Sequence, residues 1–351
     1  MREDKLRYYT YILAFLFLFF GGLYYAKNLL IPLSLGIFFA TLSYPVAHKL
    51  EKFGLSRIWA SVLCIIGLFV LLGAFIFFFA VQIVNFANTL PEKEEQLKGR
   101  LQAVKTFFNE TLRLDLSQYV DNAGSLIQEY SSTLFSYASG LVLGTVGGII
   151  GVIVVMVYVF LLLYYRTIFF NFILRLSSDN EKAAHICRNV VKVSYQYLGG
   201  RFLIIGILAV LHSTGLMIIG IENAIFFGVL SGLLDLIPYI GVIIGAGLPL
   251  LMAILTEEST WPIFAIMGMF TFTQLLENYF LTPKILGSSI KINPLFILIV
   301  IFIGGYLWGL AGMILFIPLL GMAKVLFDNV EGLKPIGYLI ADPESRGEKI
   351  E

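Results

Sequence analysis

The stretch SGLLDLIPYIGVIIGAGLPLL, residues 231–251, lies within a long apolar part of the chain, yet it contains a carboxylate and an interrupted backbone pattern. Asp235 is the carboxylate, and two prolines and four glycines share the segment with it. What such a segment does depends on the solvent around it, so the composition of the whole chain comes first.

The composition identifies that solvent as a lipid bilayer. Of 351 residues, 58% are hydrophobic and only 13% are charged, whereas soluble domains are about 25% charged. A crossing helix needs about 20 apolar residues, and this chain can supply many. The net charge of +1 does not suggest nucleic acid, and the first apolar run is long enough to be a span rather than a cleaved signal peptide. The sequence therefore predicts an all-α, polytopic membrane protein.

The apolar runs differ in length, and this separates crossing helices from shorter ones. The runs long enough for full spans are six, at about residues 9–26, 28–47, 58–86, 141–165, 202–220 and 263–281. Four others are too short to cross comfortably, at 224–237, 240–255, 294–307 and 310–327. We therefore expect about six spans and two re-entrant helical hairpins in the C-terminal half.

The distribution of Lys and Arg predicts the orientation, because cytoplasmic loops collect cations. The N-terminus, the turn after the second span and the segment 166–201 are rich in them, and Arg201 is expected at the cytoplasmic edge of the fifth span. Both termini are therefore expected in the cytoplasm. The expected organisation is 1–86 with three spans, 87–140 as an extracytoplasmic amphipathic helical segment, 141–165 as the fourth span, 166–200 as a cytoplasmic helical linker, 201–327 as a transport core with broken helices, and 328–351 as a cytoplasmic tail.

Residues 92–113 carry apolar side chains at helical spacing with charges around the rest of the wheel. The pattern predicts an external amphipathic helix. It could pack on the membrane surface or on a neighbouring subunit, or it could form a cap that gathers substrate.

Within a membrane, residues 231–251 are expected to contain a broken helix. Pro238 lacks a backbone donor and Gly241 can adopt a positive φ, so the helix is expected to open around Tyr239. Irregular backbone at membrane depth requires protein or water around it, and transporters bind cargo at such breaks. Asp235 is then a functional candidate, because charges within the membrane are costly. Alternatively, it caps the next short helix.

A second polar cluster lies in residues 270–287. Gln274, Glu277 and Asn278 are three and four residues apart, which places them on one helix face. They could bind a hydroxyl-rich ligand or relay a proton. The alternative is a structural role in hydrogen bonds between membrane helices.

Glycines and prolines mark the expected turns of this half. Gly199 and Gly200 are expected to let the chain turn into the fifth span, and Pro283 is expected to end its helix. The predicted turn residues are Gly199, Gly200, Pro283, Pro294, Gly304 and Gly305.

Several chemistries are not indicated. His212 and Ser213 are adjacent and would not face each other on a helix, and Cys64 and Cys187 lack the spacing of metal ligands. Neither a Walker A motif nor a dinucleotide-binding glycine fingerprint occurs. We therefore expect no enzyme, no metal, no cofactor and no ATP hydrolysis by this chain alone.

The C-terminal half resembles a known family. The motifs IPYIG at 237–241, ENYFLTPKILG at 277–287, NPL at 293–295 and GGYLWGLAGMILFIP follow in order within residues 195–327. They resemble the autoinducer-2 exporter family of bacterial permeases. The resemblance implies a homopentamer in the bacterial inner membrane, with arched re-entrant hairpins. It also implies that Asp235, the turn from Pro238 to Gly241, Glu277 and Asn278 line the path.

Three functions remain open at this point. The first is a secondary transporter or facilitator of a small polar solute, with an autoinducer-2-like furanone as the leading cargo. The second is a sodium/proton antiporter in which Asp235 and Glu277 alternately bind and release protons. The third is a membrane scaffold that transports nothing.

Overall fold

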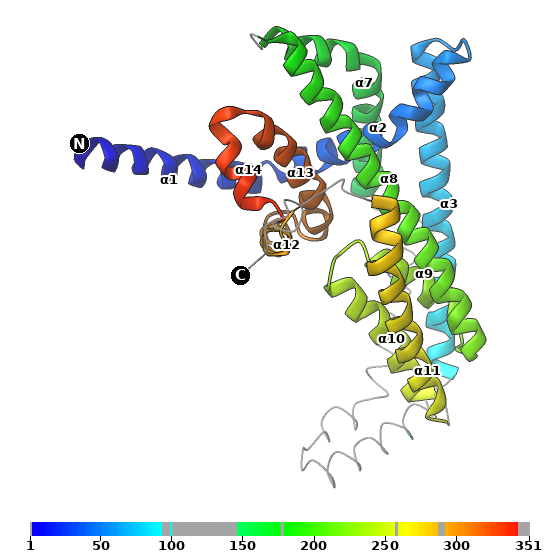
Figure 1. Ribbon diagram of the computed structural model, residues 1–351. Helices are drawn as coiled ribbons and strands as arrows, with labels where there is room; N and C mark the ends of the chain where they lie inside the picture. The colour runs from blue at the N-terminus through cyan, green and yellow to red at the C-terminus, as the bar shows by residue number, and fades with distance from the viewer. Residues whose placement is uncertain are drawn as a thin grey trace. The chain divides into compact units, whose positions relative to one another are not determined.

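The computed structural model describes residues 2–92, 99, 146–176, 179–256, 259–286 and 292–342, and these are almost entirely helical (Figure 1). They form no strand, only one isolated antiparallel bridge between Ile292 and Ala341. The predicted all-α class is confirmed. Most of the predicted external segment 87–140, with nearly all of the amphipathic helix at 92–113, lies outside the described residues.

The helices follow the apolar runs. The α-helices are α1 (Arg2–Tyr25), α2 (Lys27–Lys52), α3 (Arg57–Glu92), α7 (Val146–Leu176), α8 (Asn180–Ile219), α9 (Ala224–Leu234), α10 (Ile240–Thr256), α11 (Trp261–Leu276), α12 (Pro294–Trp308), α13 (Leu310–Asn329) and α14 (Lys334–Ile340). The others are the π-helix η2 (Glu277–Leu286) and the 3-10 turn η3 (Glu331–Leu333).

Five of the described helices are long and apolar enough to cross a membrane, namely those at 27–52, 57–86, 150–176, 180–219 and 310–329. Four of them contain or overlap predicted spans. The fifth, α13, has 20 residues, so the expectation that it is too short to cross was wrong. The predicted span at 263–281 is divided between α11 and η2. The protein is thus a multi-pass membrane protein.

The chain folds into two compact units that alternate along the sequence. The first comprises residues 1–66, 150–200 and 286–351, and the second comprises 67–149 and 201–285. The long helices α3 and α8 contribute to both. Residues 201–327, expected as one transport core, also contribute to both units.

In the first unit, α12 and α13 form a tightly packed hairpin. It turns at Gly309, whose φ of 61° favours glycine, and not at Gly304 and Gly305, which lie inside α12. Gly304 instead lets the two helices approach closely, because a Cβ there would meet the backbone of Gly312. The indole nitrogen of Trp308 donates a hydrogen bond to the carbonyl of Leu23 at 2.9 Å, which fastens the hairpin to α1.

In the second unit, α9 and α10 form another hairpin, and α11 packs against α10. The core is aromatic and aliphatic, with Phe227, Leu216 and Ile266 almost fully buried. This core joins α9 and α10 to α3, α8 and α11.

Two expected turns are not formed. Gly199 and Gly200 lie inside α8, which runs unbroken from Asn180 to Ile219 (Figure 1). Pro283 does not end its helix but lies within η2. A proline ring clashes with the carbonyl four residues earlier, here that of Tyr279, and the helix is of the wider π form at this point. Pro294 does mark a boundary, since it is the first residue of α12.

Substituting Gly312 with alanine should destabilise the first unit. The new Cβ would collide with the backbone of Gly304, and overpacking of this kind costs about 1–3 kcal/mol. The thermal unfolding midpoint in detergent should fall. Gly206→Ala is the matched control, because it too is a helical glycine and has no atom within 4 Å of its position for a Cβ. An equal effect of the two substitutions would contradict the close packing of α12 and α13.

Candidate functional site

The helix break predicted in the opening stretch is present. Helix α9 ends at Leu234 and α10 begins at Ile240, so residues 235–239 form a turn. The left-handed residue in this turn is Tyr239, with φ of 67°, and not Gly241 as expected. Gly241 is needed for a different reason: a Cβ there would overlap the carbonyl of Leu234. The break is therefore a compact turn with close backbone packing.

Asp235 is buried at the C-terminal end of α9, with 4% of its surface exposed. It does not cap α10, because the residue before that helix is Tyr239. A carboxylate at a helix C-terminus is unfavourable, since the helix dipole is negative there. The guanidinium of Arg201 offsets this: its Nη2 is 2.8 Å from Oδ2 of Asp235 and also donates to the Asp235 backbone carbonyl.

Glu277 meets the same guanidinium from another helix. It stands where α11 passes into η2 and is 5% exposed. Its Oε1 is 3.1 Å from Nη1 of Arg201, and its Oε2 accepts a hydrogen bond from Gln274 at 3.1 Å. Gln274 also donates to Asn278 at 3.3 Å. Glu277 is thus joined to α8 by an ion pair. The side-chain amides of Gln274 and Asn278 form their hydrogen bonds within the α11–η2 segment itself.

Arg201 is the residue that sequence reasoning missed. The sequence predicted its position at the cytoplasmic edge of a span but not its contacts: its side chain is only 14% exposed and contacts both carboxylates. Charge balance could have indicated it, because intramembrane carboxylates usually pair with a cation. We call Arg201, Asp235 and Glu277 the ionic cluster.

Polar groups from α8, α9 and α11 surround a small cavity beside the ionic cluster. His212 Nε2 lies 2.9 Å from the hydroxyl of Thr273, and its ring stacks on Phe270. The Ser231 hydroxyl is within 2.7 Å of the carbonyl of Phe227 and 2.6 Å of that of Gly245. With Asp235 and Glu277, these groups line a space of about 10 Å³, which is room for about one water molecule.

The structure brings together some predicted residues and separates others. Asp235, Gln274 and Glu277 all line the small cavity. Tyr239 is 51% exposed and Asn278 is exposed, and neither lines it. Pro238 is half-buried in the turn. The arrangement is suited to holding a proton, a water molecule or a small cation between buried charges.

Comparison with known proteins places the chain among bacterial transporters. The family model described as AI-2E family transporter matches residues 13–332. The chain is 23% identical to "Putative transport protein YhhT" of Escherichia coli over 95% of both chains. It is 25% identical to "Putative transport protein YrrI" of Bacillus subtilis over 86% of both, and 21% identical to "AI-2 transport protein TqsA" of Escherichia coli over 94% of both. A match of this length shows that the chain belongs to the AI-2E family of membrane transporters.

Proposed function

We propose that the protein is a secondary transporter of a small polar solute and that its ionic cluster couples transport to the binding of a proton or a small cation. The observation that supports this most is the burial of two carboxylates against one guanidinium beside a broken helix. Membership of a transporter family argues against the hypothesis of a membrane scaffold that transports nothing.

The charge of the ionic cluster is the basis of the coupling. With both carboxylates ionised, Asp235 and Glu277 contribute two negative charges against one positive charge from Arg201. An uncompensated charge in a low-dielectric interior is costly. One proton or one monovalent cation would balance the cluster, so its occupancy should change with the ion gradient across the membrane.

The leading cargo is an autoinducer-2-like furanone. The support is a relative named as an AI-2 transport protein, at 21% identity, together with the motif resemblance. The cavity of about 10 Å³ is far too small for a furanone ring. Cargo passage therefore requires the site to widen, as in the rocking of one part of a transporter against another.

The size of the cavity favours a second candidate, sodium/proton antiport. A space for about one water molecule matches an ion better than a multi-atom solute. In that case Asp235 and Glu277 would be the carboxylates that exchange the two cations.

We also propose a membrane arrangement for the two hairpins. Helices α9 and α10 have 11 and 17 residues, each short of the roughly 20 needed to cross, so their hairpin would re-enter. The α12–α13 hairpin has the same form, although α13 is long enough to cross. A homopentamer in the inner membrane with both termini in the cytoplasm follows from the family resemblance and the cation distribution.

Flux through purified protein in liposomes should distinguish the two candidates. Vesicles carrying the protein are loaded with the furanone, and efflux is followed under an imposed pH gradient. In parallel, a pH-sensitive dye inside the vesicles reports proton movement when sodium is added outside. Furanone efflux that responds to the pH gradient would support the leading proposal, whereas sodium-driven proton movement without furanone efflux would support antiport.

Vesicles without protein and vesicles with Glu277→Gln are the controls. The amide keeps the hydrogen bond with Gln274 but cannot form the ion pair. If wild-type protein moves neither furanone, sodium nor protons above the level of empty vesicles, both candidates fail.

A further inference from the structure

The first unit contains a broad cavity, separate from the ionic cluster, of about 1490 Å³. Its walls come from α2, α7, the first part of α8, and the end of α13 with η3. Most of the lining side chains are apolar, such as Leu162, Phe170 and Ile186. Small-molecule sites usually measure 300–1,000 Å³, so this space suits a larger, mostly apolar occupant.

Cations face this cavity from two helices. Of its charged lining residues, four are basic (Arg166, Lys182, Arg188 and Lys192) and two are acidic (Asp179 and Glu331). The carboxylate of Asp179 is already engaged, since it accepts a hydrogen bond from the backbone of Lys182 at 2.9 Å. Because Arg166 is paired with Glu51, three cations face two carboxylates, and this balance favours a negatively charged group in the occupant.

Three of these cations lie at a similar height in the α7–α8 hairpin. Arg166 is ten residues before the end of α7, and Arg188 and Lys192 are eight and twelve residues after the start of α8. At 1.5 Å per residue these positions are about 12–18 Å from the tip. Arg188 and Lys192 are also four residues apart on α8, which places them on one helix face, so both can contact one anionic headgroup.

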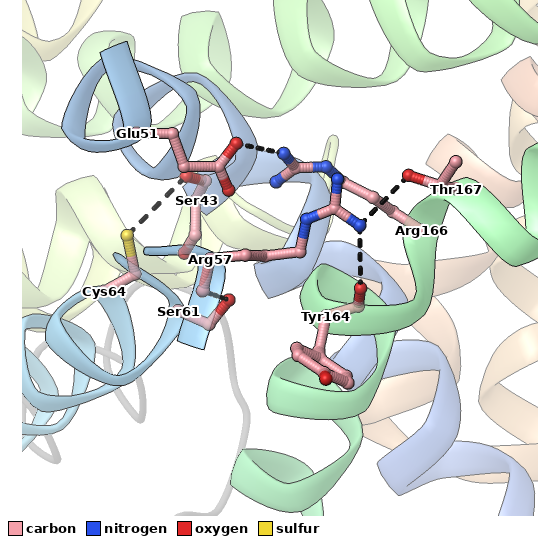
Figure 2. Close-up of polar contacts among 8 residues, drawn as sticks. All are labelled: Ser43, Glu51, Arg57, Ser61, Cys64, Tyr164, Arg166 and Thr167. Carbon is pink, nitrogen blue, oxygen red and sulfur yellow. Dashed lines mark hydrogen bonds and ion pairs between the residues drawn. The ribbon is translucent and has the colours of Figure 1, made fainter. Parts of the chain in front are cut away.

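Arg166 is held rigidly but incompletely satisfied. Figure 2 shows its guanidinium paired with Glu51 of α2, while Arg57 of α3 binds the carbonyl of Tyr164 at 3.3 Å and the hydroxyl of Thr167 at 3.1 Å. These contacts fix α7 beside α2 and α3. Among the described atoms, Nη1 of Arg166 has no hydrogen-bond acceptor. That atom is itself buried, so Arg166 shapes the wall of the cavity, and the cations of α8 are left to meet an occupant.

The end of α7 beyond Arg166 is apolar and open. Phe169 is 50% exposed and Leu176 is 71% exposed, and both line the cavity. On α8, Val191 adds a further exposed apolar wall. Large exposed apolar surfaces of this kind normally contact a membrane or another molecule, which does not suit a linker surrounded by water.

We propose that this cavity binds an anionic phospholipid, with its phosphate at Arg188 and Lys192 and its acyl chains along the apolar walls of α7 and α8. Basic pockets between membrane helices on the cytoplasmic side are the usual place for such headgroups. The cation distribution of the sequence predicts that this end of the hairpin lies on that side.

Native mass spectrometry of the full-length protein in detergent tests the proposal with phosphatidylglycerol as the probe and phosphatidylcholine as its zwitterionic counterpart. Wild-type protein should retain phosphatidylglycerol in preference to phosphatidylcholine. The double variant Arg188→Gln/Lys192→Gln should weaken phosphatidylglycerol binding by roughly 25-fold, because each cation near a headgroup contributes about fivefold. Val191→Trp should put a bulky ring on the apolar wall of α8 beside Lys192 and weaken phosphatidylglycerol binding further.

Matched controls lie on the same two helices. Arg175 of α7 and Gln196 of α8 are exposed but do not line the cavity, so Arg175→Gln and Gln196→Trp should bind phosphatidylglycerol as the wild type does. Equal retention of both lipids would overturn the proposal. So would competition by inorganic phosphate at the concentration of the lipid, which would indicate a phosphate site without acyl chains. A change of oligomeric state in Val191→Trp with lipid binding unchanged would assign the surface to a second copy of the chain instead.

Discussion

Replacing Arg201 with glutamine is expected to reduce the folded yield and the thermal stability of the protein sharply. The substitution leaves the carboxylates of Asp235 and Glu277 buried and removes the cation that pairs with both of them. Removing one partner of a buried ion pair typically costs about 3–5 kcal/mol. It would also remove the donor to the Asp235 carbonyl at the end of α9. The measurement is the unfolding midpoint of detergent-purified protein, together with the fraction that elutes as a single species in size-exclusion chromatography.

Two comparisons make this result specific to the ionic cluster. Lys284→Gln removes an exposed cation from η2 and should leave stability near that of the wild type. The triple variant Arg201→Gln/Asp235→Asn/Glu277→Gln removes every charge of the cluster and should recover much of the lost stability, because neutral replacement of a whole buried charge group is often well tolerated. A triple variant as unstable as Arg201→Gln would indicate that the arginine acts through packing alone.

The break in the opening stretch was predictable because its causes are local. Pro238 removes a backbone donor, and each of the two apolar runs beside it is too short to cross the membrane by itself. The interruption between α9 and α10 can therefore be predicted from the sequence. Which residue takes the positive φ could not be read in this way. Gly241 has the greater conformational freedom, but it is required where α10 passes the Leu234 carbonyl, and Tyr239 takes the left-handed conformation instead.

The ionic cluster was predictable only in part, because its members come from three helices. Asp235 and Glu277 stand out individually as carboxylates in apolar surroundings. Their common partner depends on how α8 passes α9 and η2, and sequence spacing carries no such information. The rule that collects cations in cytoplasmic loops predicts on which side of the membrane Arg201 lies, but it does not predict that the side chain is buried between two carboxylates.

The glycine pair before Arg201 gave a misleading signal for a related reason. Glycine lowers helix stability by about 1 kcal/mol per residue, and this favoured a turn at Gly199–Gly200. Helix α8 continues through both residues, and packing on either side of them holds it: Leu198 is buried in the first unit and Ile204 in the second. Tertiary contacts outweigh the local preference here.

The second large effect is expected from Asp235→Asn, which should abolish or strongly reduce transport while leaving the fold intact. Asparagine is close in shape to aspartate and can still accept a hydrogen bond from Arg201. The remaining pair, Arg201 and Glu277, is balanced in charge, so the stability penalty of the Arg201 variant should not appear. The protein would lose the carboxylate whose charge changes with ion occupancy. Transport should fall roughly 5- to 150-fold, the usual range of coupling between sites, and what remains should no longer depend on pH.

Asp179→Asn is the matched control for this charge removal. Asp179 precedes α8 and accepts the hydrogen bond from the Lys182 backbone, a capping role that asparagine fills about as well. Its carboxylate lies in an exposed position, outside the ionic cluster. Both variants and the wild type are compared in liposomes at equal protein content across a series of pH values. Wild-type flux with a wild-type pH profile in Asp235→Asn would leave this residue as a structural partner of Arg201, and the coupling group would then have to be Glu277, whose glutamine variant tests that directly.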